Sequence, residues 1–316
     1  MYTEFFGLNE KPFSITPDPR YLYLTDRHAD ALAHLMYGIV ESGGFIQLTG
    51  EVGTGKTTLI RSLLEQMPTE ARLAVILNPN LTAMEFLAAI CVELQIPLPE
   101  LQSKSALIGA LNHYLLKAHA NGTRVVLIVD EAQTLDAVLL EQVRLLTNLE
   151  TAKQKLLQII LIGQPELREL LARPDMRQIA QRITGRFHLE PLSLEETYAY
   201  VQHRMKVAGA QTQVFNRSAI RELYRRSGGI PRLVNVVADR ALLAGYTLDS
   251  PKIAGKLVKR AASEVFGQTR RHWWPYPVFG IALLLCGVLA APVAKQLLGP
   301  GDTAGTNTSA VVAESE

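Results

Sequence analysis

The sequence has 316 residues, enough for about two soluble units, and its hydrophobic (48%) and charged (20%) contents are those of a globular protein. Its two cysteines, Cys91 and Cys286, lie far apart, which argues against a disulfide framework or a cysteine metal site. The N-terminus lacks the basic and apolar regions of a secretory signal. We therefore expect the front of the protein to stay in a reducing cytoplasm.

The formal net charge of +2 conceals an uneven distribution. Residues 1–189 carry 17 basic and 20 acidic side chains, whereas residues 190–272 carry 14 basic and 7 acidic ones. The remaining residues hold one lysine and three acidic side chains. The basic middle segment is typical of a surface that faces nucleic acid or an anionic membrane.

The first 25 residues are rich in aromatic residues and in prolines that exclude a regular helix. Their apolar character predicts a segment wrapped on the folded core. Thr25 or Asp26 can cap a following helix that runs to about Ser42, with apolar residues on one face.

The most specific motif follows that helix. An apolar run, Phe45 to Thr49, leads into Gly50-x-x-x-x-Gly55-Lys56-Thr57, and a helical apolar pattern comes next. This strand, glycine-rich loop and helix form a P-loop, in which backbone N–H groups and the helix N-terminus hold phosphate oxygens. We expect Lys56 to reach the β- and γ-phosphates of ATP and Thr57 to bind Mg²⁺. The predicted nucleotide-binding residues are Gly50, Glu51, Val52, Gly53, Thr54, Gly55, Lys56, Thr57 and Thr58.

A second strand is predicted at 73–77, and helices at 83–94 and 106–120. The first of these helices carries Cys91, which we interpret as a core residue. Val125 to Val129 then predicts a buried parallel strand that ends in Asp130 and Glu131. Downstream of a P-loop, such a pair predicts Asp130 as a ligand of hydrated Mg²⁺ and Glu131 as the base that orients the attacking water.

A helix is predicted at 137–150 and a fourth buried strand at 156–162. Gln164 follows this strand and either contacts the γ-phosphate or the attacking water, or belongs to a turn around Pro165. Arg182 and Arg186 come next, where the chain leads into a short strand predicted at 186–189. Four residues apart on a helix, they are candidates for an arginine finger that acts on a neighbouring subunit.

Residues 190–266 show only helical periodicity, which predicts a small helical domain. Ser193 and Glu196 form a capping box that opens a helix to about Ala208. Further helices are predicted at 217–227, 232–244 and 252–265. Together the patterns give an α/β domain at 1–189 and a helical lid at 190–268.

An uncharged stretch of 22 residues runs from Trp273 to Ala294. As a helix it spans about 33 Å, enough for a hydrocarbon core of about 30 Å. Arg270 and Arg271 precede it, which predicts a single transmembrane helix with the preceding domains in the cytoplasm. The tail at 295–316 is rich in small and polar residues and is expected to be a disordered periplasmic segment.

With these residues the chain resembles AAA+ ATPases of the general secretion pathway protein A (ExeA/GspA) family over about residues 1–294. The motifs that carry the resemblance are Phe6-Gly7-Leu8, Lys11-Pro12-Phe13, Pro17-Asp18-Pro19, the P-loop, Asp130-Glu131-Ala132-Gln133, Ile162-Gly163-Gln164-Pro165-Glu166 and Gly229-Ile230-Pro231-Arg232.

The resemblance implies an α/β fold: a five-stranded parallel AAA+ sheet with a C-terminal helical lid, followed by one transmembrane helix. By similarity, Asp130 and Glu131 are the Walker B residues. Gln164 stands at the sensor 1 position and Arg232 at the sensor 2 position, and either Arg182 or Arg186 is the arginine finger. The resemblance also implies a ring oligomer, which a hexamer would fit, and an inner-membrane partner of the ExeB/GspB kind.

ExeA-type proteins continue past the membrane into a peptidoglycan-binding domain, whereas this sequence ends after a short tail. Direct binding to peptidoglycan is therefore not expected, and the sequence fits either a shorter relative, such as a pilus-biogenesis ATPase of the MshM type, or a truncated chain.

Two functions remain open. The first is a membrane-anchored ATPase that assembles or positions an envelope machine for type II secretion or a type IV pilus. The second is a DNA-associated AAA+ ATPase related to transposition or replication-initiation ATPases, whose basic lid would track phosphates. The predicted span favours the first, because anionic lipid already accounts for the charge of the lid.

Overall fold

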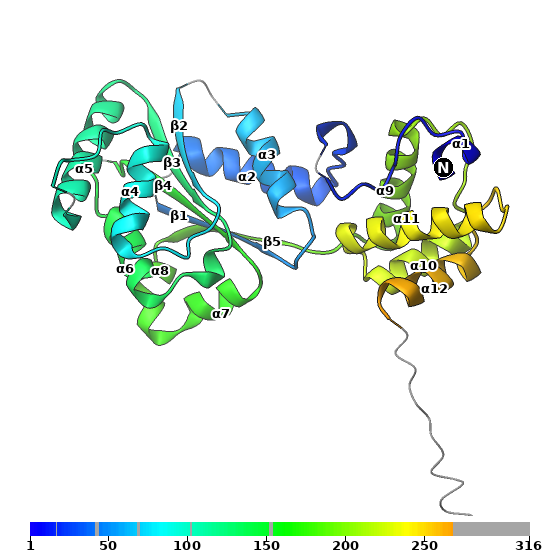
Figure 1. The fold of residues 1–316 in the computed structure, drawn as a ribbon. Coiled ribbons are helices and arrows are strands. Elements are labelled where there is room, and N and C mark those ends of the chain that lie inside the picture. Colours follow the sequence, from blue (N-terminus) through cyan, green and yellow to red (C-terminus); the bar gives the residue numbers. More distant parts are fainter. Residues whose placement is uncertain (17, 42–43, 68–69, 102, 152–153, 268–316) are drawn as a thin grey trace, which may run out of the picture. The chain divides into compact units, whose positions relative to one another are not determined.

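The computed structural model describes residues 1–267 apart from residues 17, 42–43, 68–69, 102 and 152–153 (Figure 1). The span predicted at 273–294 and the tail predicted at 295–316 lie outside the described residues. Among the helices that the structure describes, none is both long enough and apolar enough to cross a membrane.

A parallel sheet forms the centre of the N-terminal domain. Five strands pair in the order β2-β3-β4-β1-β5, which confirms the predicted five-stranded parallel sheet. Their bounds are β1 Gly44–Gly50, β2 Ala71–Ile76, β3 Arg124–Val129, β4 Leu157–Gly163 and β5 Ile183–Leu189. β1 and β4 are buried along their whole length, whereas the edge strand β5 alternates between buried and exposed positions. The central strands therefore read as continuous apolar runs, because helices cover both faces of the sheet.

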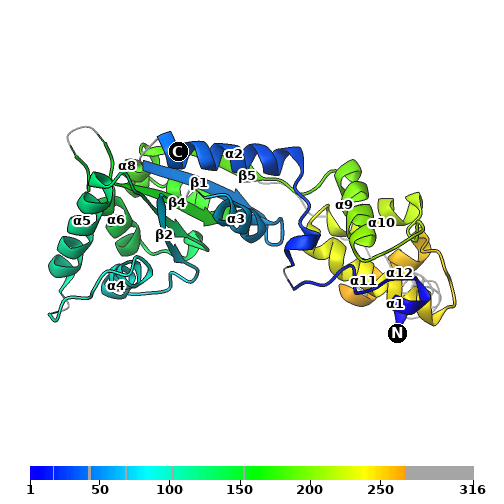
Figure 2. The same ribbon diagram turned by 90° about the horizontal axis from the view of Figure 1, so that it is seen from above.

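Two layers of helices provide that cover (Figures 1 and 2). One face packs against α4 Ala83–Glu93, α5 Lys104–Ala120, α6 Ala137–Leu146, α7 Glu166–Ala172 and α8 Arg177–Ala180. The other face packs against α2 Asp26–Glu41 and α3 Lys56–Glu65. Cys91 is fully buried in the first cluster, and burial raises the pKa of its thiol. Its predicted role as a core residue is confirmed.

The four helices that follow β5 in the sequence form a second hydrophobic cluster together with the N-terminal segment. The helices are α9 Leu194–Val207, α10 Arg217–Ser227, α11 Pro231–Thr247 and α12 Gly255–Val265. The N-terminal segment contains the short helix α1 Tyr2–Phe5 and the 3₁₀ turn η1 Pro19–Tyr21. Its buried members in this cluster are Tyr2, Phe6, Leu8, Phe13 and Tyr21. The prediction that the first residues wrap on a core is confirmed, and that core belongs to the helical lid.

Arg204 on α9 fixes the N-terminal segment to the lid. Its guanidinium donates to the carbonyl oxygens of Pro12 (2.6 Å) and Ser14 (3.1 Å) and lies 4.7 Å from the centre of the Tyr21 ring. The side chain is buried, and its charge is met by carbonyl dipoles and the aromatic face. A segment that contains only two short helical turns thus gains a defined position on the lid.

Several predicted boundaries are wrong. β5 begins at Ile183 instead of residue 186, because backbone pairing with β1 already starts at Ile183, upstream of the predicted strand. α6 ends at Leu146 instead of residue 150. α11 continues to Thr247, three residues beyond its predicted end. α12 begins at Gly255 instead of residue 252, because Ile253 forms a β-bridge with Phe215 through backbone hydrogen bonds to Val214 and Asn216.

Candidate nucleotide-binding site

The P-loop lies between β1 and α3, as predicted. Gly53 and Gly55 have φ values of +86° and +106°, in the region that favours glycine. Gly55 is the N-cap of α3, so the loop turns directly into the helix N-terminus. The local sequence therefore builds a concave run of backbone N–H groups, which is a typical anion-binding structure.

Lys56 is the buried cation of this loop. Its Nζ donates to the carbonyl oxygens of Gly50 (2.7 Å) and Glu51 (3.0 Å). Burial lowers the pKa of Lys56, and the nearby carboxylates of Glu131 and Asp130 act in the opposite direction. The ammonium group is thus held inside the loop and faces the Walker B acids.

Asp130 and Glu131 follow β3 at the carboxyl edge of the sheet. Asp130 is buried, and desolvation raises the pKa of its carboxyl even though its Oδ1 accepts the Glu131 N–H at 2.9 Å. Glu131 has a left-handed backbone conformation (φ +51°), which is uncommon for a residue with a side chain. The tight turn gives the two carboxylates different surroundings.

Two oxygen donors of the site, one from Asp130 and one from Thr57, are the predicted ligands of a Mg²⁺ ion. Asp130 supplies a carboxylate and Thr57 a hydroxyl, and Mg²⁺ takes few protein ligands together with phosphate oxygens and waters. No cluster of three or more His, Cys, Asp or Glu side chains suited to a metal occurs in the part of the chain that the structure describes. If Mg²⁺ binds here, Asp130 and Thr57 are its predicted protein ligands, and phosphate oxygens and waters would complete its coordination.

Gln164 lies beside Glu131. Its Nε2 donates to Glu131 Oε2 at 3.2 Å, so the structure brings the two residues together as their predicted roles require. Gln133, which was noted only as part of a motif, also donates to Glu131 Oε2, at 2.5 Å. In the sequence, the feature that could have identified Gln133 as a site residue is its position two residues after Glu131, the predicted base.

Arg232 opens α11 and rests on the P-loop. Its backbone N–H donates to the carbonyl oxygen of Gly53 at 3.3 Å. A Cβ at Gly53 would lie 2.6 Å from the Cβ of Arg232, so this close approach requires a glycine. The residue at the predicted sensor 2 position therefore joins the lid to the phosphate-binding loop.

The two candidate finger residues lie away from this loop, and the prediction that they share a helix is wrong. Arg182 follows α8 and donates to Thr147 Oγ1 (2.6 Å) and Asn148 Oδ1 (2.7 Å). Arg186 lies within β5 and donates to the carbonyl oxygen of Ala180. The helix ends early because β5 pairs with β1 from Ile183 onward.

A cavity of about 490 Å³ lies beside the P-loop. Its lining includes P-loop residues, Glu131 and Arg232. Other lining residues were missed by the sequence analysis: Tyr21, Leu22, Tyr23, Leu24, His28, Leu192, Tyr200 and Asn235. These residues supply an aromatic and apolar part of the lining, as expected of a pocket for a nucleoside, and charged side chains such as Asp18, Arg61 and Arg204 supply another part. The aromatic run at 21–24 was a signal in the sequence, but by itself it indicated only packing.

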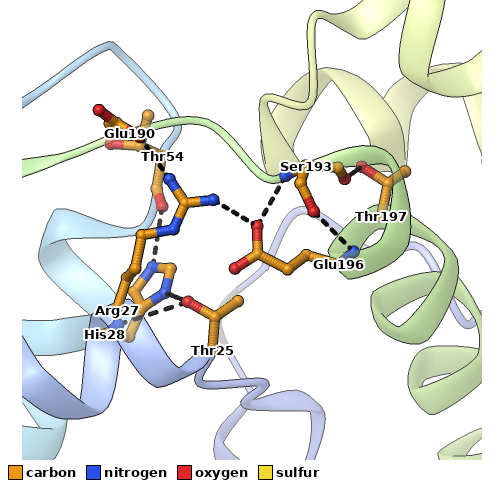
Figure 3. A network of polar contacts seen from close by, with 8 residues as sticks. All are labelled: Thr25, Arg27, His28, Thr54, Glu190, Ser193, Glu196 and Thr197. Carbon is orange, nitrogen blue, oxygen red and sulfur yellow. Dashed lines mark hydrogen bonds and ion pairs between the residues drawn. The ribbon is translucent and has the colours of Figure 1, made fainter.

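A polar network connects the P-loop to the lid beside this cavity (Figure 3). His28 is buried between Thr25 Oγ1 (2.7 Å) and the carbonyl oxygen of Thr54 (3.4 Å), and burial lowers the pKa of its imidazole. The neighbouring Arg27 pairs with Glu190 and with Glu196, a member of the α9 capping box. Adjacent residues of α2 thus contact the phosphate-binding loop and the first lid helix.

Comparison with known proteins agrees with this geometry. A family model described as an AAA domain matches residues 40–171. General secretion pathway protein A of Aeromonas hydrophila is 52% identical over 289 residues, which is 92% of this chain. The chain spans about half (52%) of the length of that relative.

Solved structures share the fold. Cdc6p of Pyrobaculum aerophilum has a TM-score of 0.65 at 19% identity, with 90% of this chain and 78% of that chain covered. The ORC2 protein of Aeropyrum pernix, described as ADPNP and ADP complexes, has a TM-score of 0.60 at 18% identity over 81% and 71% of the two chains. The chain therefore has the α/β P-loop AAA+ fold, carries an AAA domain, and is similar to general secretion pathway protein A along nearly all of its length, as predicted from its motifs.

Proposed function

We propose that this chain is a membrane-anchored AAA+ ATPase that binds and hydrolyses ATP to drive assembly or positioning of a bacterial envelope machine. One observation carries the enzymatic part. A single cavity is lined by the P-loop cation Lys56, the predicted base Glu131 and the lid residue Arg232. The ADPNP and ADP complexes described for the ORC2 protein support an adenine nucleotide as the ligand.

In this proposal, different residues of the site bind the phosphates, hold the metal ion and activate the attacking water. Lys56 and the P-loop N–H groups bind the phosphates, and Arg232 adds positive charge from the lid. The Thr57 hydroxyl and the Asp130 carboxylate would hold Mg²⁺, which neutralises phosphate charge when it is bound. Glu131 orients the attacking water and accepts its proton, with Gln164 hydrogen-bonded to the same carboxylate.

The role in an envelope machine rests on the similarity to general secretion pathway protein A. Type II secretion and type IV pilus assembly are the candidate systems. An inner-membrane partner protein and a ring of subunits are part of this proposal, because AAA+ sites are commonly completed by an arginine from a neighbouring subunit.

A location at the inner membrane rests on the span predicted at 273–294 and on the lid. The exposed face of α12 carries Lys256, Lys259 and Arg260, and this helix ends at Val265, eight residues before the predicted span. Basic side chains this close to a bilayer interact favourably with anionic lipid headgroups.

The alternative, a DNA-associated ATPase, has less support. The likeness to the Cdc6p and ORC2 structures is below 20% identity and concerns the fold. On α10, Arg225 and Arg226 both pair with Glu222, which reduces the charge that this helix presents to phosphates.

The proposal is tested with the full chain in membranes. Fractionation should recover the protein with the inner membrane, and ATP hydrolysis by the solubilised protein should depend on Mg²⁺. Crosslinking in intact membranes should then join it to itself and to a membrane protein. A chain that remains in the soluble fraction, or that binds no adenine nucleotide, would contradict the proposal.

A further inference from the structure

The side chain of Gln133 bridges two segments of the site. Gln133 lies in the 3₁₀ turn η2 Ala132–Thr134, directly after the predicted base. Its Nε2 donates to Glu131 Oε2 at 2.5 Å, and its Oε1 accepts the backbone N–H of Gln164 at 3.0 Å. Both ends of the amide are therefore used, one on the base and one on the residue that follows β4.

The end of β4 is shaped around this amide. A Cβ at Gly163 would lie 2.6 Å from Gln133 Oε1 and 3.2 Å from Leu167 Cβ. The backbone of Gly163 does not require a glycine, because its φ lies outside the left-handed region. A side chain at this position would therefore meet the Gln133 carbonyl group first and the Leu167 side chain next.

The bridge constrains the carboxylate of Glu131. Gln133 and Gln164 both donate to Oε2, from two different segments of the chain. With that oxygen engaged, the other oxygen of the carboxylate has a defined direction. A carboxylate on a strained turn would otherwise rotate about its side-chain torsions, and small displacements of a catalytic base reduce the rate strongly.

We propose that Gln133 is a positioning residue for ATP hydrolysis: it clamps Glu131 through Oε2 so that Oε1 faces the attacking water, and it ties that base to the backbone of Gln164. The clamp rests on the proposed ATPase function of the same site. Gln133 does not line the cavity. Its loss therefore affects turnover and leaves nucleotide binding intact.

The first test compares Gln133→Met with the unmodified full chain. Methionine keeps the length of the side chain and removes both hydrogen bonds. We expect kcat to fall about 10- to 100-fold, the range for a lost hydrogen bond to a charged group, with KM and the Kd for ADP within about twofold. Gln133→Glu keeps an acceptor for the Gln164 N–H but loses the donor to Glu131, and it should be as impaired as Gln133→Met.

The second test uses the space at Gly163. Gly163→Ala should lower kcat in the unmodified background, because the new methyl group meets Gln133 Oε1. In a Gln133→Ala background the closest obstruction is gone, and Leu167, whose Cδ2 and Cβ would lie 3.1 and 3.2 Å from the new methyl group, must shift only slightly. The double variant should therefore have the same kcat as Gln133→Ala to within about twofold, whereas independent effects would multiply.

The outcomes of these tests distinguish a failure of the proposed Gln133 clamp from a failure of the proposed ATPase function. Hydrolysis by the unmodified chain and its loss in Glu131→Gln report on the ATPase function alone. If the unmodified chain hydrolyses ATP and Gln133→Met keeps normal kcat, the clamp is wrong. A parallel loss of ADP binding, or multiplicative effects of the Gln133→Ala and Gly163→Ala changes, would also overturn it. An unmodified chain that binds ADP but never hydrolyses ATP would overturn the ATPase function and the clamp together.

Discussion

Arg27 Nη2 donates to Glu196 Oε2 at 2.8 Å, so the first turn of α2 is joined to the N-terminus of α9 (Figure 3). The same carboxylate also accepts the backbone N–H of Ser193 at 2.7 Å, which completes the capping box of α9. The residue beside Arg27, His28, contacts the carbonyl oxygen of the P-loop residue Thr54. One helix end therefore links the phosphate-binding loop to the start of the lid.

This link predicts a pH dependence of stability. Partial burial opposes ionisation of Glu196, but the Ser193 N–H and Arg27 outweigh it and lower the pKa of the carboxyl below its ordinary 4.5. The stabilisation is therefore complete above pH 4.5 and is lost as the pH falls through the lower pKa of the folded state. Glu196→Gln should flatten this part of the curve of unfolding free energy against pH. Glu195→Gln, on the same turn, is the control, and equal curves for both variants would contradict the assignment.

Lys56→Ala removes the buried cation of the P-loop. We expect ATP affinity to fall at least about 10- to 100-fold, because a charge-assisted interaction with the phosphates is lost. Equilibrium binding of a fluorescent ATP analogue measures this change. Lys104→Ala, at an exposed lysine on α5, is the matched control. If the Lys56→Ala variant kept its affinity for ATP, the assignment of the P-loop as the nucleotide-binding site would be wrong.

Glu131→Gln keeps the shape of the predicted base and removes its charge. Because an amide cannot accept the proton of the attacking water, we expect hydrolysis to fall about 100- to 10,000-fold with ATP still bound. Steady-state hydrolysis and nucleotide binding measured on the same preparation separate the two effects. Normal turnover by this variant would end the assignment of Glu131 as the base.

The arginine finger is predicted to act between subunits. Lys56→Ala subunits keep the finger, whereas Arg182→Ala or Arg186→Ala subunits keep the nucleotide site, so mixing the two kinds should restore activity for the arginine that is the finger. A mixture of Lys56→Ala with Glu131→Gln has no complete site and is the control. If neither arginine variant recovers activity in a verified mixed oligomer, action in trans is wrong.

The basic face of α12 is predicted to bind anionic membranes. Changing Lys256, Lys259 and Arg260 to Gln should weaken binding to vesicles that contain anionic lipid by up to about 100-fold, since each basic residue near the surface contributes about 1 kcal/mol. The binding should also weaken with salt. Residues 1–267 form one compact unit and suit a sedimentation assay.

The matched control for this assay changes two lysines and one arginine on the N-terminal domain, Lys104, Lys117 and Arg124, to Gln. Equal losses for both triple variants would indicate a nonspecific charge effect. Tight duplex DNA binding in the presence of ATP, lost in a variant with Arg221, Arg225 and Arg226 changed to Ala, would instead favour the DNA-associated alternative.

The sequence by itself determined the parts of this protein that local chemistry specifies. The buried strand β3 contains an unbroken apolar run, Val125 to Val129, and the P-loop has fixed glycine spacing between a strand and a helix. The predicted Walker B acids, Asp130 and Glu131, are recognisable because these charged side chains directly follow the buried strand β3. Each of these signals lies within a few residues, where periodicity and turn geometry decide the structure.

Only the tertiary structure decided which distant residues meet. Arg204 holds a segment about 190 residues away, Arg232 approaches Gly53, and the Gln133 amide fills the space beside Gly163. Arg182 and Arg186 were predicted on a helix that leads into a strand at 186–189, but pairing of β5 with β1 from Ile183 onward places Arg186 within the strand. Such contacts depend on how packed elements bring side chains together over long sequence separations, and no local pattern of residue types encodes that arrangement.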